Sequence, residues 1–200
     1  MSNVIGIVNY GVAGNIHSVQ KAIEKAGGKV KIVNTKEELL AVDKIILPGV
    51  GSFRDAMEEL HNKELVESLK EVVQEKSILG ICLGMQILTS LGFEYGKTAG
   101  LGFINAEVKP MLVDAKVPHL GFSSIEVIKS NAILKGLENE EFYFMHSYEV
   151  VNYTDIATLT SYANHKFVSS IHKDKVYGVQ FHPEKSRDAG IRLFTNFIEL

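Results

Sequence analysis

The sequence predicts an α/β protein with a central, mostly parallel sheet flanked by helices and an antiparallel β extension in the C-terminal half. In the first half, short apolar runs alternate with amphipathic helical segments. This alternation is typical of a parallel sheet with helices on both faces. In the second half, apolar residues alternate or cluster in short runs separated by turns, which indicates antiparallel strands.

A short apolar run at residues 4–8 predicts a buried strand, and three further strands are expected at residues 30–33, 44–47 and 77–81. Apolar residues at spacings of three and four predict a helix from Asn15 to Ala26, which Gly27 and Gly28 end. The same spacing predicts a second helix from Asp55 to Val73. A helix is therefore expected after the first strand and another between the third and the fourth.

The pattern changes after about Leu91. Further strands are expected at residues 125–128, 142–145, 156–159, 167–171 and 176–181, with turns at 130–131 and 173–174. A final helix is expected from Ala189 to Glu199. No linker, repeat or low-complexity segment interrupts the 200 residues, so we expect a single domain over residues 1–200.

Composition and charge exclude several classes of protein. The 21 Lys and Arg residues against 24 Asp and Glu give a net charge of −3, which argues against a nucleic-acid binder. Apolar runs of about four to six residues are far below the roughly 20 that a membrane helix needs, and residues 1–6 have no leader pattern. With one cysteine there is no internal disulfide or Cys-based zinc site, so a soluble cytoplasmic protein is expected.

The single cysteine lies in a pattern that predicts a nucleophile. Gly80-Ile81-Cys82-Leu83-Gly84 follows an expected strand and precedes a helical pattern. This is the Gly-x-nucleophile-x-Gly elbow with Cys in place of Ser, in which the glycines permit a sharp turn. A helix N-terminus beneath the sulfur favours thiolate over thiol. A lone cysteine is more often a buried structural residue, but the elbow favours a nucleophile.

A thiolate nucleophile needs an imidazole to hold its proton and return it to the leaving group. His182 is the best candidate, because an apolar run leads up to it and Pro183 ends the strand after it. Glu184 can fix the tautomer and orientation of the ring. His61, His165 and His172 lie in polar stretches typical of solvated side chains, whereas His17, His119 and His146 fit either structural or site-lining positions. No pair of histidines has metal-ligand spacing, so no metal is expected.

Two glycine loops follow expected strands. Gly49-Val50-Gly51 can bring backbone amides to a developing oxyanion, and the amide of Leu83 is the second donor. The lysine and Ser/Thr of a phosphate-binding loop are absent. The other loop, Gly11 to Asn15, is similar to a dinucleotide loop but lacks the third glycine, and no acidic residue ends the second strand. No cofactor is therefore expected.

Together, the elbow and a Phe-His-Pro-Glu segment about 100 residues later resemble the class I (triad) glutamine amidotransferases. The resemblance covers nearly the whole chain and implies a flavodoxin-like fold. Within this family, the chain resembles in particular the glutaminase subunits that work with a cyclase in histidine biosynthesis. The segments that carry this closer resemblance are residues 9–11 with 14–15, 47–51, 117–121, 143–148 and 178–186.

The resemblance implies a Cys-His-Glu glutaminase. Cys82 would attack the side-chain amide of glutamine, form a glutamyl thioester and release ammonia, with His182 as general base and then acid and Glu184 as its orienter. The oxyanion hole would be framed by Gly49, Val50 and Leu83. The substrate would be held by Gln86, Gly51 and the backbone of His146, Ser147 and Tyr148.

The resemblance also implies a partner. Ammonia would pass to a (β/α)8-barrel cyclase subunit in a heterodimer, which makes imidazole glycerol phosphate and an aminoimidazole carboxamide ribotide. No nucleic acid or membrane is implied as a partner.

Two departures from the family pattern leave an alternative open. Gly121-Phe122-Ser123 stands where the family usually has Gly-Trp-Asn, and His17 follows a Gly-Asn-Ile run where a basic Arg is usual. In family members these segments lie toward the partner. The alternative is a paralogous glutaminase that supplies ammonia with a second cyclase-like barrel for amidino-sugar synthesis on surface polysaccharide or flagellin. A different cysteine hydrolase would not need the Phe-His-Pro-Glu segment, and a non-catalytic scaffold would not need a complete triad.

Overall fold

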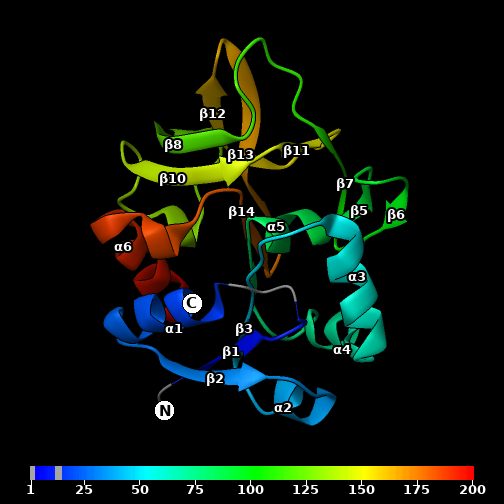
Figure 1. The fold of residues 1–200 in the computed structure, drawn as a ribbon. Coiled ribbons are helices and arrows are strands. Elements are labelled where there is room, and N and C mark those ends of the chain that lie inside the picture. Colours follow the sequence, from blue (N-terminus) through cyan, green and yellow to red (C-terminus); the bar gives the residue numbers. More distant parts are fainter. Residues whose placement is uncertain (1–2, 12–14) are drawn as a thin grey trace.

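The computed structural model describes residues 3–11 and 15–200 (Figure 1). Its main sheet has eight strands in the order β2-β1-β3-β4-β14-β13-β12-β9. The parallel strands are β1 (Val4–Val8), β2 (Lys29–Val33), β3 (Lys44–Leu47), β4 (Ile78–Ile81) and β14 (Val176–Val179). The antiparallel extension consists of β13 (His165–Lys173), β12 (Ile156–Tyr162) and β9 (Glu126–Val127). The predicted fold class is confirmed.

Two smaller sheets complete the C-terminal half. One pairs β8 (His119–Ser124) with β10 (Glu141–His146). The other has the order β11-β7-β5-β6, formed by β11 (Tyr148–Val151), β7 (Ile104–Pro110), β5 (Thr89–Gly92) and β6 (Thr98–Ala99). Only Ser147 separates β10 from β11, so the chain passes directly from one small sheet to the other.

Helices cover both faces of the main sheet (Figure 1). On one face lie α1 (Ile16–Lys25) and α6 (Arg187–Ile198), and on the other α3 (Phe53–Asn62), α4 (Leu65–Val72) and α5 (Leu83–Ile87). Ile5 and Ile7 of β1 pack in the core beneath the first pair, whereas Val8 packs in the opposite core. Burial on both faces is why these strands are continuous apolar runs rather than alternating ones. None of the helices in the described residues has the length and hydrophobicity of a membrane span.

Several predicted boundaries were wrong. The single helix expected from Asp55 to Val73 is two helices, because Glu64 adopts a left-handed conformation with φ 55° that interrupts the helical hydrogen bonding. The helix expected after Cys82 is short and ends at Ile87. Two short helices were not predicted from the sequence: α2 (Lys36–Leu40) and the 3-10 helix Ala132–Leu134. The Thr35 hydroxyl caps α2 by accepting a hydrogen bond from the Glu38 amide.

Gly84 lets α5 pack directly on β3. A Cβ at this position would overlap the carbonyl oxygen of Leu47. We therefore expect Gly84→Ala to lower the free energy of unfolding by about 3 kcal/mol, because overpacking a rigid contact forces the backbone apart. Urea unfolding followed by circular dichroism measures this.

Gly27→Ala is the matched control for Gly84→Ala. Gly27 has φ +90° and no atom within 4 Å of an added Cβ, so alanine there meets only the conformational cost of about 1 kcal/mol. Equal losses in the two variants would contradict the packing argument.

Candidate active site

Cys82 lies at a sharp turn between β4 and α5. Its backbone adopts φ 53° and ψ −108°, a conformation that residues other than glycine rarely adopt and that concentrates at functional sites. The Cys82 amide donates a hydrogen bond to the Val179 carbonyl at 2.8 Å. A Cβ at Gly80 would lie 2.5 Å from the Gly84 carbonyl oxygen, so this glycine is required by packing.

His182 reaches the same place because β14 lies beside β4 in parallel, with Val179 opposite Ile81. Its Nδ1 lies 2.8 Å from Oε1 of Glu184, and both side chains are completely buried. Glu184 sits in a short 3-10 helix, Pro183–Lys185. The carboxylate also accepts a hydrogen bond of 2.7 Å from Nδ2 of Asn15. Asn15 was expected at the end of the glycine loop and the start of the first helix, and no local signal linked it to Glu184.

The environment of His182 favours its charged form. Burial by itself lowers the pKa of this imidazole, but the interaction with Cys82 and the hydrogen bond and charge of Glu184 outweigh it and raise the pKa to about 10. The ring is therefore an imidazolium at neutral pH, suited to pair with a thiolate.

Cys82, 7% exposed, opens into a pocket that collects most of the predicted substrate residues. Its lining includes Val50, Gly51, Leu83, Gln86 and the segment 146–148. Gly49 does not line the pocket. It lies behind it, where an added Cβ would collide with the Tyr10 hydroxyl and touch the Leu83 side chain. His182 and Glu184 are buried beneath the pocket rather than in its wall.

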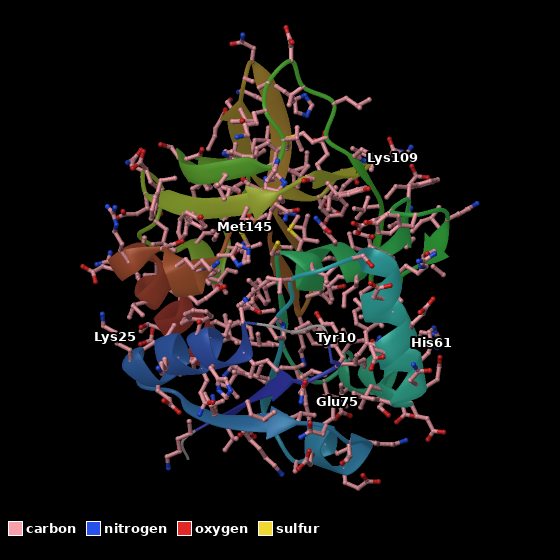
Figure 2. The ribbon with its side chains drawn as sticks, viewed as in Figure 1. Tyr10, Lys25, His61, Glu75, Lys109 and Met145 are labelled. Atoms are coloured by element: carbon pink, nitrogen blue, oxygen red, sulfur yellow. The ribbon has the colours of Figure 1, made fainter. Side chains whose placement is uncertain are left out.

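Four further residues line the pocket that were not predicted from the sequence, namely Glu94, Tyr95, Pro118 and Met145. Glu94 accepts a hydrogen bond of 2.8 Å from the Phe53 amide, which ties the segment after β5 to the start of α3. Burial raises the pKa of the Glu94 carboxyl. Met145, labelled near the centre of Figure 2, offers its carbonyl oxygen to the Cys82 sulfur at 3.8 Å. Pro118 and Met145 lie in segments that carry the family resemblance, whereas Glu94 and Tyr95 lie outside any such segment, so only their position in the fold reveals them.

His119 and His146 form a buried hydrogen-bond chain next to the pocket. His146 Nδ1 lies 2.9 Å from the Tyr148 carbonyl, His119 Nδ1 lies 3.2 Å from His146 Nε2, and Ser123 Oγ lies 3.0 Å from His119 Nε2. Burial lowers the pKa of His146 to about 4 and that of His119 below its usual value. With both rings neutral and the carbonyl able only to accept, Ser123 donates to His119 and His119 to His146. Ser123, one of the departures, thus orients His146.

His165, Phe122 and His17 do not line the pocket. His165 was predicted to be solvated, but its Nε2 lies 2.9 Å from both carboxylate oxygens of the buried Glu149. Phe122 is partly exposed, and the guanidinium of Arg187 lies 4.6 Å from the centre of its ring. His17 is exposed on α1. In the glycine loop Gly11 to Asn15, residues 12–14 lie outside the described residues.

A family model described as glutamine amidotransferase class-I matches residues 7–200, and the chain belongs to this family. Solved structures agree on the fold. One described as a glutamine amidotransferase has a TM-score of 0.78 at 19% identity and covers 98% of this chain and 99% of that chain. PurLQS from Thermotoga maritima has a TM-score of 0.80 at 17% identity, covering 100% and 99%. At such identities the likeness supports the fold alone.

Closer relatives give the branch of the family. The imidazole glycerol phosphate synthase subunit HisH 1 of Campylobacter jejuni is 43% identical over 202 residues, covering 98% of this chain and 100% of the relative. The HisH subunit of Methanocaldococcus jannaschii is 44% identical over 199 residues, with the same coverage. These relatives place the chain in the HisH branch and confirm the predicted resemblance.

Proposed function

We propose that this HisH-type chain hydrolyses glutamine through a thioester on Cys82 and passes the ammonia to a HisF-type (β/α)8 cyclase subunit for imidazole glycerol phosphate synthesis in histidine biosynthesis. One observation carries the proposal. The strained Cys82 faces a pocket and lies beside a completely buried His182–Glu184 pair joined at 2.8 Å. The chain acts as a single amidotransferase domain over residues 1–200, in the cytoplasm.

The triad performs acyl transfer in two steps. The Cys82 thiolate attacks the side-chain carbonyl carbon of glutamine, and the His182 imidazolium gives its proton to the departing nitrogen, which leaves as ammonia. The neutral imidazole then takes a proton from water, which attacks the thioester and releases glutamate. Glu184 keeps the proton of Nδ1 in place and so fixes the tautomer.

The developing oxyanion needs backbone donors already in position. Leu83 follows the nucleophile, and its amide is one candidate donor. The second comes from the loop of Gly49 and Val50, because this loop lies against the same side of the Cys82 turn.

The pocket suits the amino-acid end of glutamine. Gln86 commits Nε2 to the carbonyl of Tyr148 at 3.3 Å and to Gln180 Oε1 at 3.0 Å, which leaves its oxygen to accept from the α-ammonium group. The Glu94 carboxyl at the pocket wall complements the same positive charge. Gly51 and the backbone of residues 146–148 face the remaining polar atoms of the substrate.

Glutamate release from glutamine tests the proposal. The purified chain is assayed alone and then with each cyclase-like barrel of its genome and a phosphoribulosyl nucleotide. We expect glutamate and imidazole glycerol phosphate to appear together with the histidine-pathway barrel. Activation only by a different barrel would overturn the pathway and point to the sugar-modifying alternative. No glutamate with any barrel would overturn the glutaminase assignment.

The alkaline limit of activity tests the role of His182. Its protonated form is the acid that expels ammonia, and a pKa raised to about 10 by Cys82 and Glu184, against the effect of burial, keeps that proton on the ring at higher pH. We expect kcat/KM of the complex to stay level between about pH 7 and 9 and to fall as pH rises through about 10. Circular dichroism at each pH controls for unfolding.

Glu184→Gln supplies the comparison for this pH profile. The amide cannot stabilise the imidazolium, so the alkaline limit should move to lower pH. Wild-type activity that already declines near pH 6.5 would contradict the assignment of His182 as the acid.

A further inference from the structure

Gln180 is a buried polar residue that has no part in the proposed Cys82–His182–Glu184 mechanism. It lies one residue beyond β14 and two before His182, and its side chain is completely shielded from solvent. Its backbone amide donates to the Ser169 carbonyl at 2.9 Å. A side-chain amide without access to water is costly unless its own donors and acceptor find partners. The side chain of Gln180 forms hydrogen bonds with Cys82 and Gln86.

The orientation of the Gln180 amide follows from its neighbours. The Tyr148 carbonyl can only accept, so the Gln86 atom 3.3 Å away is the donor Nε2. That same nitrogen lies 3.0 Å from Gln180, which must therefore present its oxygen there. The Gln180 nitrogen is left facing the Cys82 sulfur at a distance of 3.5 Å. One N–H group of Gln180 thus points at the reacting atom of the proposed nucleophile.

We propose that Gln180 is a further catalytic residue, whose amide N–H stabilises the Cys82 thiolate while its oxygen holds Gln86 in the orientation that binds glutamine. The inference rests on the proposed function. A hydrogen bond to the charged form of a group favours that form, and a bond to an ionised acceptor is stronger than a neutral one.

Gln180 and His182 stabilise the Cys82 sulfur in different ways. The imidazolium supplies charge and must give up its proton during the reaction. The amide of Gln180 carries no charge and does not titrate, so it donates to the sulfur throughout the cycle. It therefore stabilises the thiolate when the thioester breaks and the sulfur becomes the leaving group.

The test is the pH dependence of Cys82 alkylation by iodoacetamide, which reacts with the thiolate. Gln180→Glu keeps the shape and the acceptor but loses the donor, and Gln180→Met removes both. Loss of one charge-assisted hydrogen bond is expected to lower the alkylation rate at pH 7 by about 10- to 100-fold and to move the inflection to higher pH. The Glu variant should be the slower one, because a second negative charge then faces the sulfur.

Thr158→Val is the matched control. Thr158 is fully buried and hydrogen-bonded at 2.8 Å to Ser169 and Ser170, but it does not line the pocket. This variant should lower the thermal midpoint without changing the alkylation profile. Folded Gln180 variants with a wild-type profile would overturn the proposal.

If the Gln180 variants do not fold, NMR of the wild-type protein tests the same proposal. In the wild-type protein, the side-chain NH2 resonance of Gln180 should shift with the ionisation of Cys82, and its insensitivity to that ionisation would overturn the proposal. Alkylation is independent of glutamine hydrolysis. A chain that fails to release glutamate but shows the altered profile would therefore refute the proposed function, and with it the catalytic role of Gln180, while leaving its stabilisation of the Cys82 thiolate established.

Discussion

Replacing Cys82 by alanine is expected to lower glutamine hydrolysis by about 10⁴-fold or more, the scale on which loss of a catalytic nucleophile acts. Without the sulfur no thioester forms, and acid–base catalysis by His182 has no nucleophile to act with. The fold should survive, because Cys82 contributes only a small side chain at a turn that its flanking glycines and the Val179 carbonyl hold. Glutamate release by the complex measures the loss.

Complex formation with the cyclase is the control for Cys82→Ala, because ammonia transfer and docking are separate properties. We expect the variant to bind the barrel like the wild type. Cys82→Ser supplies a second control, since it keeps the shape of the side chain but places a weaker nucleophile at the turn. Glutamate release that persists in the alanine variant would refute the role of Cys82.

The isolated chain is expected to be about 10²- to 10³-fold less active than the complex, the range in which loss of one oxyanion donor lowers kcat. A glutaminase that ran without its partner would waste glutamine. The structure supplies a means of control. Within the described residues the Val50 amide makes no hydrogen bond, and Gly49 and Gly51 on either side make rotation of its peptide sterically easy. The preceding Pro48 carbonyl is held by the Tyr10 hydroxyl.

Activation by the barrel measures this effect through kcat at saturating glutamine. A change confined to KM would indicate that the partner completes the substrate pocket rather than the oxyanion hole. High activity of the chain alone would contradict the prediction. Alkylation of Cys82 should be similar with and without the barrel, because the thiolate does not depend on the position of the Val50 amide.

The sequence predicted what is encoded in contiguous segments. Four strands of the first half were found within one residue of their bounds. Three of them, β1, β3 and β4, are buried on both faces and therefore short apolar runs, whereas β2 is half-exposed and alternates. The elbow around Cys82 was visible because only glycine fits at positions 80 and 84. Segments whose conformation has no such signature were missed. Glu64 interrupts a helix by adopting a left-handed conformation. The residues that usually signal this conformation are Gly and Asn, and neither occurs at this position.

The arrangement of the site depends on contacts between distant segments. Asn15 meets Glu184 across 169 positions in the chain, and Gln180 meets Cys82 across 98. Neither pairing has a local pattern, since each follows from which strand lies beside which. Glu94 enters the pocket for the same reason, because β5 belongs to the smaller sheet that borders it.

By itself, the sequence determined the fold class, the family and the residue types of a cysteine hydrolase, because periodicity and glycine-flanked motifs are local properties. The tertiary structure decided how they act together. The pairing of β4 with β14 brings Cys82 beside His182, and the interactions of that imidazole with Cys82 and Glu184 keep it protonated against the opposing effect of burial. The pocket wall is assembled from loops and small sheets. Distances, burial and charge depend on the three-dimensional neighbours of a residue, and only folding sets those neighbours.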